Sequence, residues 1–198
     1  VTDPATVPRT RARPSEVHER ILDAADRLFY ADGATSVGID RVISEAGVAK
    51  ASLYSHFAGK DALVLAHLHR RAERATARLE ESLVTLPADA AEARVHVVFD
   101  DLWAWLAEDS FRGCPFINAA VEYPDPQHPV RQFVRQHRHD FVGMLREQLA
   151  GGGSRYADPL LPQALAMVYD ASLVTAQTDD SATAEAGGRY LLGRVLAP

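Results

Sequence analysis

The stretch GIDRVISEAGVAKASLYSHFAGKDAL, residues 38–63, decides the fold of this chain. Its first part carries apolar residues at the spacing of one helix face, at Ile39, Val42, Ile43 and Ala46. Gly47 predicts the end of this short helix, because a left-handed backbone costs glycine little. A further helix is expected from about Val48 or Ala49 to just before Gly59, with Ala49, Leu53 and Phe57 as its buried face.

A longer amphipathic helix precedes these two. Ser15 is its expected N-cap, followed by acidic residues in the first turn, and Gly33 ends it. Its apolar face is formed by Ile21, Leu22, Ala25, Leu28 and Phe29. Three helices of about 18, 8 and 9 residues in this order are typical of a helix-turn-helix unit. A three-helix packing module without a nucleic-acid partner has the same periodicity, so the pattern alone leaves both interpretations open.

The rest of the chain is also expected to be helical. The apolar periodicity predicts helices over about residues 60–86, 88–108, 130–150, 159–178 and 182–196, with a broken, proline-containing region at 111–129. Three consecutive glycines at 151–153 predict a firm helix stop. No window shows the sustained alternation of a strand, so the predicted fold class is all-α.

Composition and charge narrow the class of protein further. The chain has 198 residues, of which 47% are hydrophobic and 24% charged, as in an ordinary folded protein. Its net charge is −6, yet residues 9–60 hold eight basic against seven acidic residues. A nearly neutral segment binds phosphate if its positive groups share one face. The single cysteine excludes an internal disulfide, and the absence of a long apolar run predicts a cytoplasmic protein that does not enter a membrane.

The exposed face of the helix after Gly47 is the candidate DNA-reading surface. It carries Lys50, Ala51, Ser52, Tyr54, Ser55 and His56, small and polar groups that let a helix sit deep in a major groove. Lys50 can reach a guanine edge or a phosphate, whereas Tyr54 and Lys60 at the rim suit phosphate oxygens. Basic residues of the N-terminal segment can follow the DNA backbone, namely Arg9, Arg11 and Arg13. Solvated surface side chains are the alternative for each residue.

With these residues in view, the sequence resembles the DNA-binding signature of TetR-family transcriptional regulators. The AGV turn at 46–48, the LYSHF segment at 53–57 and the GKDAL segment at 59–63 carry the likeness, which covers about residues 15–65. One position departs from the family pattern, since Gly38 stands where a threonine often caps the second helix. Glycine also caps helices but offers no side-chain phosphate contact, so we expect Thr35 or Ser36 to supply it.

The resemblance also implies an assembly and a mode of regulation. Residues 1–14 are rich in Pro, Thr and Arg without periodicity and are expected to form a flexible basic arm. The resemblance predicts a helix-turn-helix DNA-binding domain at 15–60 and a ligand-binding and dimerisation domain at 61–198. Family members are mostly homodimers, paired through their last two helices, that repress a pseudo-palindromic operator until a small molecule releases them. Small residues in these helices permit close packing, namely Ala164, Ala166, Ala171, Ser172, Ala176, Gly187 and Gly188. Packing within one chain is the alternative explanation.

A candidate effector site is expected around residues 112–131, which resemble a stretch found beside the ligand cavity in a subset of the family. Its candidate residues are Trp103, Phe116, Asn118, Phe141, Leu145 and Tyr169. Aromatic residues at helical spacing also form ordinary cores, and Asn118 has a backbone carbonyl as its alternative partner.

Three other interpretations carry less support. Cys114 is either a thiol sensor or a small buried apolar residue, as free cysteines usually are. Neither His67 with His69 nor His137 with His139 suits metal chelation, because residues two apart point to different sides of a helix. An all-α enzyme lacks any recognisable catalytic motif, so no cofactor is expected. A DNA-binding module without an effector remains an alternative.

Overall fold

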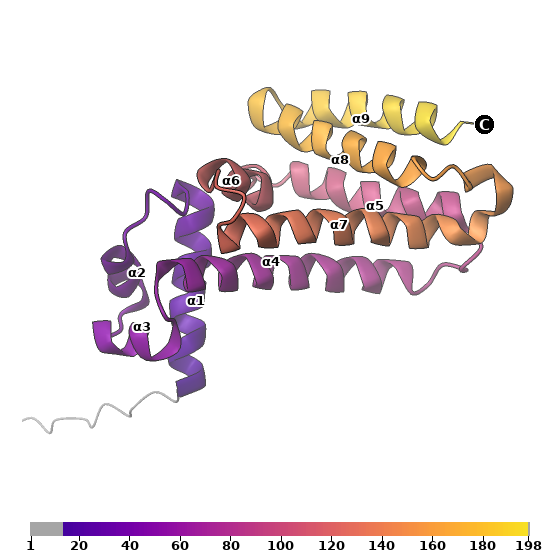
Figure 1. Cartoon of the computed structure of the whole chain (residues 1–198). Helices are drawn as coiled ribbons and strands as arrows, with labels where there is room; N and C mark the ends of the chain where they lie inside the picture. The colour runs from indigo at the N-terminus through magenta and orange to yellow at the C-terminus, as the bar shows by residue number, and fades with distance from the viewer. Residues whose placement is uncertain (1–13, 198) are drawn as a thin grey trace, which may run out of the picture. The chain divides into compact units, whose positions relative to one another are not determined.

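The computed structural model describes residues 14–197, and within that range the chain consists of helices and contains no strand (Figure 1). The predicted all-α class is confirmed. The helices are α1 (Pro14–Asp32), α2 (Ile39–Ala46), α3 (Lys50–His56), α4 (Lys60–Leu83), α5 (Ala91–Leu106), α6 (Pro115–Glu122), α7 (Pro129–Leu149), the 3₁₀ helix η1 (Ala150–Tyr156), α8 (Leu161–Thr178) and α9 (Ser181–Leu196). They form an N-terminal unit up to residue 67 and a C-terminal unit from residue 68, so the division falls inside α4.

The N-terminal unit packs α1 against α2 and α3, with the first turns of α4 completing its core. Its fully buried side chains include Ile21, Val37, Val42, Leu53 and Leu63. Two details differ from the sequence expectation. First, α1 begins at Pro14, so Ser15 lies inside the first turn instead of capping it. Second, Ala49 is exposed, because it precedes α3 with extended backbone and its side chain is not on the buried face of the helix.

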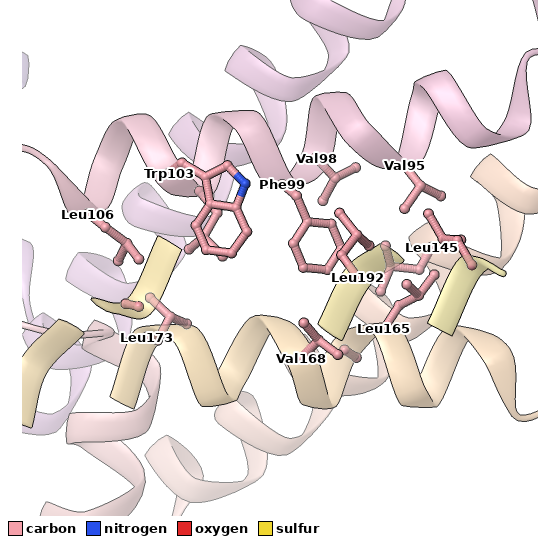
Figure 2. Packing of buried hydrophobic residues seen from close by; sticks show 14 of the residues in the cluster. Val95, Val98, Phe99, Trp103, Leu106, Leu145, Leu165, Val168, Leu173 and Leu192 are labelled. Carbon is pink, nitrogen blue, oxygen red and sulfur yellow. The ribbon is translucent and has the colours of Figure 1, made fainter. Parts of the chain in front are cut away.

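The C-terminal unit is built around α5, which contacts α7, α8 and α9. Figure 2 shows Phe99 and Trp103 of α5 among leucine and valine side chains from these helices. The most extensive helix pairing among the described residues is that of α8 with α9, which lie side by side (Figure 1). A Cβ atom at Gly188 of α9 would come within 2.2 Å of the Trp103 ring, so only glycine allows this approach.

The glycine run at 151–153 ends α7, as expected, but the chain does not become irregular there. It continues as η1, and the break lies at Gly153, with a φ of 68° and a ψ of −156°. A side chain at Gly151 would collide with the carbonyl oxygen of Ala88. The glycines therefore allow this turn to pack against the loop before α5. Between residues 14 and 197, none of the helices combines the length and the apolar character that spanning a membrane requires.

Candidate nucleic-acid interface and effector region

The turn between α2 and α3 sets the geometry of the candidate DNA-reading helix. Gly47 adopts the left-handed conformation, with a φ of 61° and a ψ of 41°, and its N–H donates to the Ser44 carbonyl oxygen at 3.1 Å. The Arg20 guanidinium of α1 donates to the carbonyl oxygens of Ala46 at 2.6 Å and Gly47 at 2.9 Å. A cation at the C-terminal end of a helix is electrostatically favourable. Arg20 thus holds the turn against α1, a contact that sequence reasoning missed because helical spacing says nothing of it.

Some side chains of the predicted reading face are exposed, and others are half-buried or already bonded within the protein. Lys50, Ala51, Tyr54 and Ser55 are exposed, whereas Ser52 and His56 are half-buried. The His56 ring packs edge-on against His18 of α1 at a centroid distance of 5.7 Å. The Ser55 hydroxyl donates to the Ser52 carbonyl oxygen at 2.7 Å, so its own proton is already used. Buried Leu53 and Phe57 anchor the opposite side of α3.

Both lysines of this surface contact oxygen atoms of the protein. Lys50 Nζ lies 3.0 Å from Asp40 Oδ1, and this contact raises the pKa of Lys50. Lys60 Nζ donates to the Thr35 carbonyl oxygen at 2.9 Å. Thr35 and Ser36 are exposed just before α2, and Gly38 caps that helix without a side-chain hydrogen bond. The predicted arm residues Arg9, Arg11 and Arg13 lie outside the described residues.

A buried polar pair connects α1 to α4 within the N-terminal unit. His67 Nδ1 lies 2.7 Å from Asp26 Oδ1, with side-chain exposures of only 4% and 13%. This contact gives His67 a structural partner. No group of three or more potential metal ligands is found between residues 14 and 197.

The candidate effector residues of the C-terminal unit are brought together only in part. Phe99 connects Trp103 and Tyr169, with ring centroids 5.8 Å and 5.9 Å away, and Tyr169 contacts Phe141 at 4.7 Å. Leu145 is fully buried in the same cluster. Phe116 packs against the same cluster and also stacks on His137, with ring centroids 3.7 Å apart. Burial lowers the pKa of His137, since the charged ring loses its water.

Asn118 is satisfied by contacts inside the protein. Its Nδ2 donates to the Arg112 carbonyl oxygen at 3.2 Å, and Gln177 Nε2 of α8 donates to its Oδ1 at 3.2 Å. The alternative of a backbone carbonyl partner is therefore confirmed, with a second partner that the sequence did not indicate. The Gln177 bond connects α6 to the end of α8, and the Arg112 bond holds the segment before α6.

Cys114 lies in an environment that suppresses thiol chemistry. Its side chain is buried, and burial raises its pKa to about 11. The sensor interpretation relied on a lowered pKa from nearby Arg112, but Arg112 Nη1 donates to the carbonyl oxygens of Asp109 and Phe111. The structure therefore favours the interpretation of Cys114 as a small buried apolar residue.

A groove of about 360 Å³ is lined by Arg138, His139, Val142 and Arg146 of α7 and by Gln163 of α8. Arg138 Nη2 is paired with Asp170 Oδ2 at 2.7 Å, while its buried Nη1 and the buried Trp103 Nε1 have no hydrogen-bond partner. The residues that line this groove differ from the six predicted effector residues.

Two helices of eight and seven residues, joined by a left-handed glycine and anchored on a third helix, define a helix-turn-helix protein. Comparison with known proteins identifies the family. Residues 21–67 match the profile described as bacterial regulatory proteins of the tetR family, and residues 91–157 match that of the tetracyclin repressor-like C-terminal domain. The chain belongs to the TetR family of transcriptional regulators.

Solved structures and curated relatives agree with this assignment. A TetR-family regulator from Streptomyces coelicolor is 36% identical, with a TM-score of 0.80, over 92% of this chain and 97% of that one. LmrA, a helix-turn-helix-type regulator of Bacillus subtilis, is 26% identical over 68% of this chain and 72% of its own length. An uncharacterised regulator of Mycobacterium tuberculosis is 38% identical over 74 residues, which span only 35% of its length.

Proposed function

We propose that the protein is a homodimeric repressor that reads a pseudo-palindromic operator through α3 and is released by a small-molecule effector. The observation that carries the DNA-binding part is the α2–α3 turn, which Gly47 and Arg20 fix while Lys50 and Tyr54 stay exposed. Such a regulator acts where the bacterial chromosome lies, in the cytoplasm. We assign it no catalytic role, since its relatives are transcriptional regulators.

The position of each residue on or beside α3 decides which part of the DNA it is proposed to contact. Lys50 at the start of α3 is proposed to contact a base edge, as the first residues of a recognition helix do. Tyr54, Lys60, Thr35 and Ser36 are proposed to contact phosphates, together with Arg11 and Arg13 of the N-terminal segment. Ala51 and Ser52 allow close approach. Ser55 and His56 are proposed to make weaker contacts, because both already have partners within the N-terminal unit.

The proposed dimer uses the outer faces of α8 and α9. Met167 and Val174 of α8 and Tyr190 and Leu191 of α9 are large apolar side chains that are 43–68% exposed. The small residues of these helices divide between two roles. Ala166, Ser172 and Gly188 are buried within the chain, which fits packing inside one subunit. Ala171 and Gly187 are exposed and free to pack against a second copy. A second copy is the occupant that a two-fold operator requires, since two heads must read two half-sites.

Selection of bound duplexes from random DNA tests the proposed function. We expect a two-fold motif with half-site centres about 34–36 Å apart or more. If a dimer makes about six or more phosphate contacts, its affinity for that motif should fall on the order of a thousandfold between about 50 and 200 mM salt. Failure to enrich any motif, or binding that salt leaves unchanged, would refute it.

The dimer has its own matched pair of variants. Met167→Asp places a charge on the proposed interface, whereas Val84→Asp changes an apolar residue that is 79% exposed elsewhere in the C-terminal unit. Light scattering should give a monomer mass for Met167→Asp and a dimer mass for Val84→Asp and the wild type. A dimeric Met167→Asp protein, or a monomeric wild type that binds the operator fully, would contradict the interface.

The effector site is proposed to involve Trp103, Phe116, Asn118, Phe141, Leu145 and Tyr169. An effector must bind the DNA-incompetent state more tightly, because equal affinity for both states shifts nothing. Asn118→Ala should therefore blunt operator release in a ligand titration while operator affinity without ligand stays within about 1 kcal/mol. A second candidate is a DNA-binding module without an effector. The contact of Phe141 with Tyr169, whose ring centroids are 4.7 Å apart, favours it, because these two candidate residues then pack against each other and not against a ligand. A thermal-shift screen against metabolites in which no compound raises the melting temperature would support this candidate.

A further inference from the structure

A highly exposed carboxylate of the N-terminal unit lies beside the candidate base-reading lysine. Asp40, the second residue of α2, holds its Oδ1 atom 3.0 Å from Nζ of Lys50, the first residue of α3. Their side chains are 78% and 61% exposed, respectively. Helix-turn-helix proteins use the first residues of the recognition helix to contact base edges. Asp40 therefore lies next to the position where a base edge is expected.

Stability does not explain this contact. Ion pairs this exposed contribute between nothing and about 1 kcal/mol, and salt screens them. Asp40 also works against DNA binding, because it cancels the charge of Lys50 and repels phosphates. A carboxylate accepts hydrogen bonds only. It can therefore contribute to binding only where the DNA offers a donor.

Donors in the major groove are the amino groups of cytosine and adenine. In a G·C pair, the guanine O6 acceptor and the cytosine N4 donor are joined by a Watson–Crick N–H···O bond, so these atoms are about 2.9 Å apart. The ammonium and carboxylate of the protein are 3.0 Å apart. The donor and acceptor of the protein thus match the acceptor and donor of the base pair.

We propose that Asp40 is a specificity-determining residue that reads one G·C pair jointly with Lys50. Lys50 Nζ donates to guanine O6 and N7, and Asp40 accepts the N4 hydrogen of cytosine that base pairing leaves free. The three N–H groups of the ammonium are then used, one on Asp40 and two on guanine. An adenine at the same place offers Lys50 only N7, and a thymine under Asp40 offers only an acceptor and a methyl group. G·C is therefore the best match.

This inference rests on the proposed role of α3, and base analogues separate the two contacts. The probe is the duplex selected by the wild-type protein, with the cytosine of the G·C pair replaced by its analogue lacking the N4 amino group. A second probe carries 7-deazaguanine, which lacks N7, in the same pair. The variants are Asp40→Ala, Lys50→Ala and the control Glu45→Ala. Glu45 is also a carboxylate of α2 in a 3.0 Å ion pair, but its partner is Arg27 of α1.

The wild-type and Glu45→Ala proteins should each bind both analogue duplexes about 5- to 100-fold more weakly than the natural duplex. Asp40→Ala should lose the penalty for the cytosine analogue and keep the one for 7-deazaguanine. Lys50→Ala should lose the penalty for 7-deazaguanine. Thermal melting verifies that each variant is folded.

Two results would overturn the inference, and they differ. If Asp40→Ala discriminates against the cytosine analogue as strongly as the wild type, Asp40 reads no base. If the wild type enriches no motif at all, the proposed function fails, and the joint reading of a base pair fails with it.

Discussion

Both units of the chain use polar contacts to fix backbone elements, but they differ in the apolar core that surrounds those contacts. In the N-terminal unit, polar contacts fix backbone elements: Arg20 holds the α2–α3 turn, and Asp26 and His67 connect α1 to α4. In the C-terminal unit, Arg94 contacts Gln148 and the Leu83 carbonyl oxygen, and a large apolar cluster around Phe99 and Trp103 packs the helices together. Two buried donor atoms of this unit have no partner. We therefore expect the N-terminal unit to be most sensitive to substitution of single polar or glycine residues. The C-terminal unit should be most sensitive to substitutions that remove side-chain volume from its core.

The largest expected effect comes from Trp103→Ala. Trp103 is 4% exposed and contacts the backbone of Gly188, so its removal leaves a cavity in the core. We expect the free energy of unfolding to fall by about 3–5 kcal/mol, as measured by denaturant titration. Trp105→Ala is the control, because Trp105 is only half-buried and should cost clearly less. A loss below about 1 kcal/mol would show that Trp103 contributes little to the stability of the C-terminal core.

Thiol reactivity tests the same packing without a mutation. With its pKa raised from 9.0 to about 11, Cys114 carries about a hundredfold less thiolate near neutral pH than an ordinary cysteine. Burial slows the reaction further. A thiol reagent should therefore react with the native protein at least about a hundredfold more slowly than with the protein unfolded in denaturant. Comparable rates in the two states would restore the sensor interpretation.

Gly47→Val is the matching test in the N-terminal unit. The left-handed φ of 61° strains a β-branched residue, and a Cβ atom would lie 3.0 Å from the Arg20 guanidinium. We expect a loss of stability of about 1–3 kcal/mol together with weaker operator binding, measured by thermal melting and by titration of the selected duplex. Gly143→Ala is the control, since Gly143 lies inside α7 and no atom lies within 4 Å of its added Cβ. Unchanged operator affinity in Gly47→Val would mean that the turn geometry does not limit DNA binding.

The sequence predicted these two units unequally, for a physical reason. Helical periodicity and Gly47 were enough to predict α1, α2, α3 and the turn, because local spacing and one backbone conformation define them. The prediction that Ala49 is buried was wrong, because Ala49 lies just before α3 and does not share the buried face of that helix. Arg20, Asp26 and Asp40 were missed as partners, since each contact joins residues at least ten positions apart in the chain. In the C-terminal unit the spacing predicted which residues are apolar, but the same spacing suits a core and a ligand pocket.

The smallest expected effect is a pH dependence of stability that comes from His137 in the C-terminal unit. Burial lowers the pKa of His137 below its ordinary value of 6.5, although nearby Asp140 opposes this shift and Arg138 adds to it. The unfolded chain therefore takes up a proton at a higher pH than the folded protein does. Stability is retained above about pH 6.5 and is lost as the pH falls from there toward the lower folded pKa.

His137→Gln removes this proton uptake from both states. The variant should lose stability at every pH, because the ring no longer stacks on Phe116 at 3.7 Å. The difference in unfolding free energy between wild type and variant should shrink as the pH falls from 7 to 5 and change little between pH 7 and 8, where the histidine is mostly neutral in both states. A difference that widens on acidification would mean that the folded state favours the charged ring. The stack on Phe116 would then act as a cation–π contact that acid strengthens.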